Sequence, residues 1–91
     1  MEIKLDPAKS NKNTLERGLP FDRVLDLDWS DTVIIPDIRY DYPEPRYIAV
    51  GYLEDRLHVT CFTPIENSIR VISLRKANAR EAKHHGKPIK R

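Results

Sequence analysis

The chain contains one cysteine, Cys61, and therefore cannot form an internal disulfide bond, which suits a protein of a reducing compartment. No apolar run approaches the roughly 20 residues that a membrane-spanning helix needs. The N-terminal residues also lack the basic segment followed by an apolar stretch that marks a signal peptide. These absences predict a cytoplasmic protein that does not insert into a membrane.

Several common signatures of catalysis and cofactor binding are also missing. With three glycines in 91 residues, the sequence has no glycine-rich phosphate loop, and it has no G-x-S-x-G motif. The adjacent His84 and His85 would point about 100° apart on a helix, which prevents chelation by both. Three aspartates around Trp29 alternate like calcium ligands, but no glycine or closing glutamate follows at the required spacing. We therefore expect neither a cofactor nor a metal ion.

The charges that are present are distributed very unevenly along the chain. Residues 66–91 carry eight lysines and arginines against two glutamates, a net charge of +6, whereas residues 1–65 sum to −4. A basic segment of this kind suits a polyanion such as RNA, and an oppositely charged protein could also dock across the dipole. The plainer alternative is a solvated basic tail.

Capping signals predict two helices in the first third of the chain. Asp6 suits the N-cap position and Pro7 the first helical position, where its missing N–H group has no cost. Gly18 suits the left-handed position after the last turn, so the first helix should end at Arg17. The apolar residues of 21–27 then favour a short second helix.

Alternating apolar residues predict the strands of an α+β domain. Strands are expected at residues 2–5, 32–35, 46–53, 57–62 and 69–74. The last three are joined by short turns into an antiparallel meander, followed by a basic helix over 77–85. One hydrophobic core fits a chain of this length, so residues 1–91 are expected to form a single domain, with 86–91 as a flexible basic tail.

The basic residues suggest a way to cleave RNA without a metal ion. Such an enzyme helps the 2′-hydroxyl attack its own phosphate, and needs a proton acceptor, a proton donor and cations that stabilise the phosphorane. Arginines supply fork-shaped donors for phosphate oxygens, and the candidates are Arg46, Arg70, Arg75 and Arg80. The titratable candidates are Glu81, His84, His85 and His58. Candidates for stacking a base are Trp29, Tyr40, Tyr42 and Tyr47.

Each candidate also has a purely structural interpretation. Arg70 could pair with an acidic residue of a neighbouring strand, and Glu81 could form a surface pair on its helix. His58 could be a hydrogen-bonded structural histidine. In addition, Arg70 and Arg75 are an odd number of residues apart, so a regular strand places them on opposite faces. Both can reach one phosphate only if the strand ends or bulges near Ser73.

Several stretches together resemble the BrnT family of bacterial toxins, the ribonuclease halves of type II toxin–antitoxin pairs. The stretches are residues 5–11, 16–21, 46–51 and 69–77 with Arg80-Glu81. The last one, Ile-Arg-Val-Ile-Ser-Leu-Arg-Lys-Ala, is the most specific. Two positions depart from the family pattern: Arg17 stands where a histidine is usual, and His85 stands where an aromatic, commonly tyrosine, ends the last helix.

The resemblance implies a RelE-like fold and metal-independent RNA cleavage that stops translation. It also implies neutralisation by a small antitoxin, typically a ribbon-helix-helix protein, with operator DNA bound only through the complex. The residues expected to act are Arg46, Arg70, Arg75 and Arg80 on phosphate, with Glu81 and His85 as acid–base candidates. The alternative is a binding module derived from such a toxin that has lost catalysis.

Overall fold

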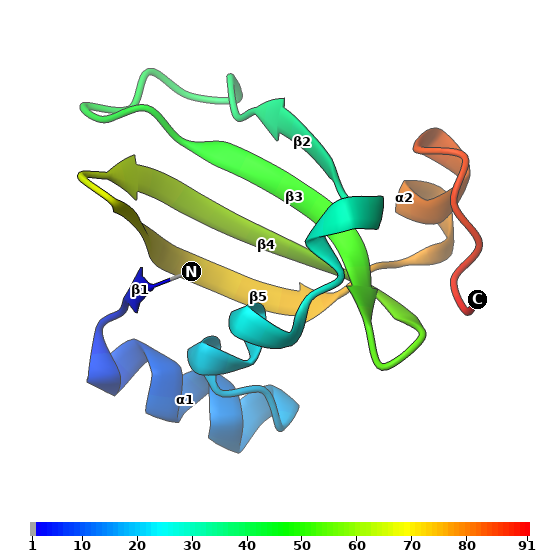
Figure 1. Ribbon diagram of the computed structural model, residues 1–91, viewed down its shortest axis with the longest axis horizontal. Helices are drawn as coiled ribbons and strands as arrows, with labels where there is room; N and C mark the ends of the chain where they lie inside the picture. Colours follow the sequence, from blue (N-terminus) through cyan, green and yellow to red (C-terminus); the bar gives the residue numbers. More distant parts are fainter. Residues whose placement is uncertain (1) are drawn as a thin grey trace.

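A single sheet organises the computed structural model, which describes residues 2–91. In this part of the chain the sheet has the order β1-β5-β4-β3-β2 (Figure 1). The strands are β1 (Ile3–Lys4), β2 (Val33–Pro36), β3 (Tyr47–Leu53), β4 (Arg56–Ile65) and β5 (Ser68–Lys76). β1 runs parallel to β5 and all other neighbours are antiparallel. The predicted α+β class and the meander of β3, β4 and β5 are confirmed.

The first helix, α1 (Pro7–Arg17), begins and ends where its capping residues predict. The Asp6 side chain accepts a hydrogen bond from the Ala8 N–H group at 2.9 Å. Gly18 has φ of 70°, and its N–H group donates to the Thr14 carbonyl at 2.8 Å. Figure 1 shows α1 alongside β5, on one side of the sheet.

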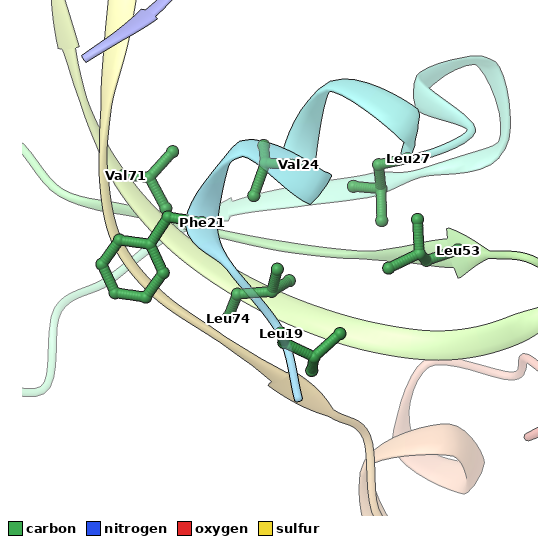
Figure 2. Packing of buried hydrophobic residues seen from close by; sticks show 7 residues of the cluster. All are labelled: Leu19, Phe21, Val24, Leu27, Leu53, Val71 and Leu74. Atoms are coloured by element: carbon green, nitrogen blue, oxygen red, sulfur yellow. The ribbon is translucent and has the colours of Figure 1, made fainter. Parts of the chain in front are cut away.

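The second predicted helix is present as a 3₁₀ helix, η1 (Phe21–Asp26), followed by a single turn, η2 (Trp29–Asp31). Phe21, Val24 and Leu27 are all buried. Their spacing of three matches the 3.0 residues per turn of a 3₁₀ helix, so all three face the sheet. They form a core cluster together with Leu19, Leu53, Val71 and Leu74 (Figure 2).

The opposite face of the sheet is covered at one end only, by α2 (Ala79–His84) and the residues that follow it. In Figure 1 these elements, orange and red, lie beyond the end of β5. The second core cluster contains Val50, Tyr52, Leu57, Val59, Ala77 and Ala82, with Ile48 and Ile89 packed against it. Asn78 and Glu81 form a capping box that starts the helix.

The C-terminal segment is ordered by hydrogen bonds, and the expectation of a frayed tail at 86–91 is wrong. The Ile89 carbonyl accepts from the Leu57 N–H group at 2.8 Å, and the Pro88 carbonyl accepts from the Tyr52 hydroxyl at 2.7 Å. Arg91 pairs with Asp28 at 2.7 Å, and Lys87 pairs with Asp31 at 2.7 Å. The two aspartates that resemble calcium ligands in sequence therefore hold the basic end of the chain.

A β-bulge in β5 places its two arginines on one face of the sheet. Cys61 of β4 is opposite Ser73, whereas the next residue, Phe62, is opposite Val71, so Ile72 is an extra residue. The bulge reverses the alternation of side chains, and Val71 and Leu74 both enter the cluster of Figure 2. Arg70 and Arg75 therefore both project from the opposite face, as the conditional prediction from the sequence required.

Candidate functional site

The candidate site lies on the half of the sheet face that α2 leaves open. Because side chains alternate along each strand, the register places Ile48 of β3, Cys61 of β4 and Ser73 of β5 side by side on this face. Arg75 marks the border with the part covered by α2, and Arg70 lies toward the other end. The two Cα atoms are separated by roughly 15 Å along the strand. We call this surface the open face.

A bidentate ion pair connects β5 to the start of α2 on the open face. Arg75 donates from Nη1 and Nη2 to the two Glu81 carboxylate oxygens, at 2.7 and 2.6 Å. Glu81 also accepts from the Asn78 N–H group at 2.9 Å. The Arg75 hydrogen bonds lower the pKa of Glu81 from 4.5 to about 2, and the same pair raises the pKa of Arg75. Glu81 is therefore a carboxylate at neutral pH and holds the guanidinium in one orientation.

Arg46 and Arg70 line a shallow hollow of about 190 Å³ at the other end of the open face. Arg70 lies 3.3 Å from a Glu44 carboxylate oxygen, and both side chains are more than half exposed, so this pair contributes little to stability. Arg46 places its guanidinium 3.9 Å from the centre of the Tyr42 ring. Arg70 thus has an acidic partner, but Glu44 belongs to the β2–β3 connection and not to a neighbouring strand.

Sequence reasoning missed a further arginine, Arg39, in the β2–β3 connection. Its Nε and Nη2 each donate to a different oxygen of Asp37 at 2.8 Å, and the Asp37 side chain is fully buried. These bonds lower the pKa of Asp37 to about 2, while the Arg39 side chain stays 58% exposed. Cys61 is among the groups that raise the pKa of Arg39, and the Arg39 charge in turn acts on Arg75, so Arg39 lies near the open face.

A signal for Arg39 was available in the pattern of residues. Asp37 and Arg39 are two positions apart and directly follow β2, which places both on the face of Ile35 if the extended backbone continues. An acidic and a basic residue at this spacing, directly after a strand, could have identified a paired guanidinium.

The remaining predicted residues lie on or after α2. Arg80 is exposed on the helix. His85 follows the last turn, and its N–H group donates to the Glu81 carbonyl at 3.1 Å. Burial, followed by the charge of His84, lowers the pKa of His85, so its imidazole is neutral at pH 7. The structure therefore brings Arg75, Glu81 and His85 together at α2, and places Arg46 and Arg70 at the far end of the face.

His58 lies on the other face of the sheet from these residues. Its partners across β3 and β5 are Gly51 and Lys76, and its side chain points toward the face covered by α1 and η1. It is 4% exposed, and its Nδ1 lies 2.7 Å from the Arg56 carbonyl. The structure therefore separates His58 from the arginines of the open face.

Comparison with protein families places these residues within one known family. A model described as the ribonuclease toxin, BrnT, of type II toxin–antitoxin systems matches residues 5–81. This chain belongs to that family. The BrnT match confirms the resemblance seen in the sequence, and with it a ribonuclease toxin whose substrate is RNA and whose partner is a cognate antitoxin. No curated protein and no solved structure matches the chain.

The BrnT match includes every residue proposed for the open face except His85. It begins at Leu5, the residue after β1, and stops at Glu81, within α2. The C-terminal segment, with the Asp28–Arg91 and Asp31–Lys87 pairs, lies after the matched range. Each helix within residues 2–91 is too short or too polar to cross a membrane.

We expect this BrnT-family protein to lose stability in acid as its two fixed carboxylates are protonated. Asp37 and Glu81 have ordinary pKa values of 3.8 and 4.5, which their arginine partners lower to about 2 in the folded chain. Because the folded-state pKa is the lower one, the stabilisation is present above about pH 4.5 and is lost toward pH 2. Urea unfolding between pH 6 and 2 measures it.

The matched control for this acid effect is Asp37→Asn. We expect the variant to be less stable than the parent at neutral pH, because Arg39 loses its charged partner, and to show a shallower decrease in acid. An equally steep decrease in the variant would contradict the assignment of this loss to Asp37.

Proposed function

We propose that this BrnT-family toxin cleaves RNA on the open face without a metal ion, in the cytoplasm, and so stops translation. The observation that carries the proposal is the Arg75–Glu81 pair, in which a fork of donors is held rigid at the border of an open surface. Arg39, Arg46 and Arg70 extend the positive charge along the same surface. Fixed guanidinium groups suit the charge that develops on a phosphorane.

The proposed roles follow from the contacts of each group. The 2′-oxygen attacks phosphorus and the bond from phosphorus to the 5′-oxygen breaks, which leaves a 2′,3′-cyclic phosphate and a 5′-hydroxyl. The neutral imidazole of His85 accepts the 2′-hydroxyl proton, and the 5′-oxygen takes a proton from water. Glu81, with a pKa of about 2, holds no proton at pH 7 and orients Arg75 instead.

Because the arginines lie at different places on the open face, we assign them to different phosphates of the RNA. Arg75 lies next to the acid–base candidates and stabilises the reacting phosphate. Arg46 and Arg70, roughly 15 Å away along the sheet, bind flanking phosphates, and the exposed Arg80 contacts the RNA backbone from α2. Arg39 lies close enough to Arg75 for its charge to oppose the rise in the pKa of Arg75, so it adds positive charge near the reacting phosphate.

The partner proposed for this toxin is a ribbon-helix-helix antitoxin, and operator DNA is bound only through the complex of the two. The support is the family resemblance together with the basic character of residues 66–91, which suits an acidic segment of a partner. Such a segment would neutralise the toxin directly if it covered the arginines of the open face.

The decisive experiment is cleavage of an end-labelled RNA by the purified protein in the presence of EDTA. We expect fragments that end in 2′,3′-cyclic phosphate, because the chemistry uses only side chains. Intact RNA, with the protein shown to be folded by circular dichroism, would contradict ribosome-independent cleavage. It would favour the alternative, a toxin-derived module that binds without turnover.

A further inference from the structure

A second basic hollow lies on the face of the sheet that carries α1, away from the open face. Its volume is about 420 Å³. The charged residues that line it are Arg23, Glu54, Arg56, Lys76 and Lys90. Four of these five are cations, and Arg17 adds another in an adjoining hollow that also includes Lys76. The only acidic lining residue, Glu54, already pairs with Arg23 at 3.0 Å.

A buried imidazole forms part of this hollow and offers it an unused ring nitrogen. His58 is 96% buried, and its Nδ1 lies 2.7 Å from the Arg56 carbonyl, which can only accept, so Nδ1 carries the proton. No hydrogen bond to Nε2 occurs within residues 2–91. Since no buried side-chain nitrogen or oxygen in this range lacks a partner, Nε2 must reach the space of the hollow.

One of the cations around the imidazole, Arg56, is held in place by the fold. Arg56 donates to the carbonyls of Leu57 and Ala77, which fixes its guanidinium between β4 and the end of β5. An isolated β-bridge between Arg56 and Lys90 brings the C-terminal segment to the same place. A group of cations without enough counter-charge leaves a positive potential that an anion would neutralise.

The path between the two faces is short at this end of the sheet. Arg75 and Lys76 are consecutive in β5, so they project to opposite faces. β1 pairs only with Ile69 and Arg70, so the later part of β5 is an edge without a strand partner on that side. An RNA strand bound by Arg75 therefore needs to cross only this edge to reach Lys76.

We propose that the hollow around His58, Arg56, Lys76 and Lys90 binds a phosphate group of the RNA at a distance from the cleaved bond. The inference rests on the proposed function, because it extends the path of the same RNA around the edge of β5. In the free protein, burial and the charges of Arg56, Lys76 and Arg23 lower the pKa of the His58 imidazole. Binding of an anion in the hollow has the opposite effect on this pKa. A bound phosphate raises it.

The test is an NMR titration of the His58 ring in the full-length protein with a 2′-O-methyl RNA oligonucleotide, which binds but cannot be cleaved. We expect the His58 signals to move and its pKa to rise. In Lys76→Gln, binding should weaken several-fold, and the slope of log affinity against log salt should fall by about 0.7. Lys12→Gln removes the same charge from the exposed side of α1 and should bind like the parent.

Several results would overturn the inference. One is that the NMR signals of the His58 ring do not move with the oligonucleotide while signals of the open face do. An acidic peptide would then be the next occupant to test. Another is a response to inorganic phosphate with no response to the oligonucleotide, which would assign the hollow to a free anion. Movement of His58 without any cleavage in EDTA would support this inference and contradict the proposed function. Cleavage in EDTA without movement of the His58 signals would support the proposed function and contradict this inference.

Discussion

Replacing Arg75 with alanine is expected to lower kcat for RNA cleavage by about 100- to 1,000-fold, the range seen when a fixed donor to developing negative charge is removed. The guanidinium is held by two hydrogen bonds of 2.7 and 2.6 Å to Glu81, so it is oriented before RNA binds. Without it, the Glu81 carboxylate would also repel the phosphate. Single-turnover cleavage of a labelled RNA in EDTA measures the effect.

One further variant tests whether the orientation of the Arg75 guanidinium matters beyond its charge, and a second serves as a control. Arg75→Lys keeps the charge but loses the fork, so it should recover only part of the rate. Lys83→Ala removes an exposed cation of α2 that is outside the proposed site, and should cleave like the parent. If the Arg75→Ala protein is folded, still binds antitoxin and cleaves RNA at the parent rate, Arg75 has no role in the reaction.

Replacing Gly51 with alanine is expected to destabilise the fold by about 2 kcal/mol, within the range for forcing extra atoms into a packed site. The added Cβ would overlap the hydroxyl oxygen of Thr32, well inside van der Waals contact. Thr32 cannot easily turn away, because its hydroxyl donates to the Asp28 carbonyl at 2.6 Å. For a domain of this size the melting temperature should fall by roughly 10 °C.

A double-mutant cycle with Thr32→Ala assigns this loss to the overlap. Thr32→Ala removes the hydroxyl and the methyl group, leaving the Cβ at 3.1 Å from the new atom. The Gly51→Ala cost should therefore be smaller in the Thr32→Ala background than in the parent. Equal costs in both backgrounds would show that the loss arises elsewhere in β3.

The sequence predicted the candidate site in part. Arg70, Arg75 and Glu81 were identified from their residue types and from the family motif. That motif did not reveal the Arg75–Glu81 pair, because a strand and a helix must first meet before two side chains six positions apart can share hydrogen bonds. His58 was a candidate because it lies one strand away in sequence, but the pleat sends its ring to the other face.

Local chemistry in the sequence was enough to determine the elements of this protein. Asp6, Pro7 and Gly18 bound α1 through their own backbone and side-chain properties, and the alternation of apolar residues marks β3, β4 and β5. The spacing of Arg70 and Arg75 also gave the condition for a shared face, a bulge near Ser73, although the two residues stand at opposite ends of that face. These predictions succeeded because each depends on residues close together in the chain.

The tertiary structure alone decided the features that depend on contacts between distant segments. The C-terminal residues looked like a free tail until the fold placed Asp28 and Asp31 beside Arg91 and Lys87. Arg39 acquired its place near the open face because burial of Asp37 requires a charged partner. The energy of such contacts exists only after the sheet has formed. A local pattern such as Asp37 and Arg39, two positions apart, can therefore suggest a pair but cannot place it over a face of the sheet.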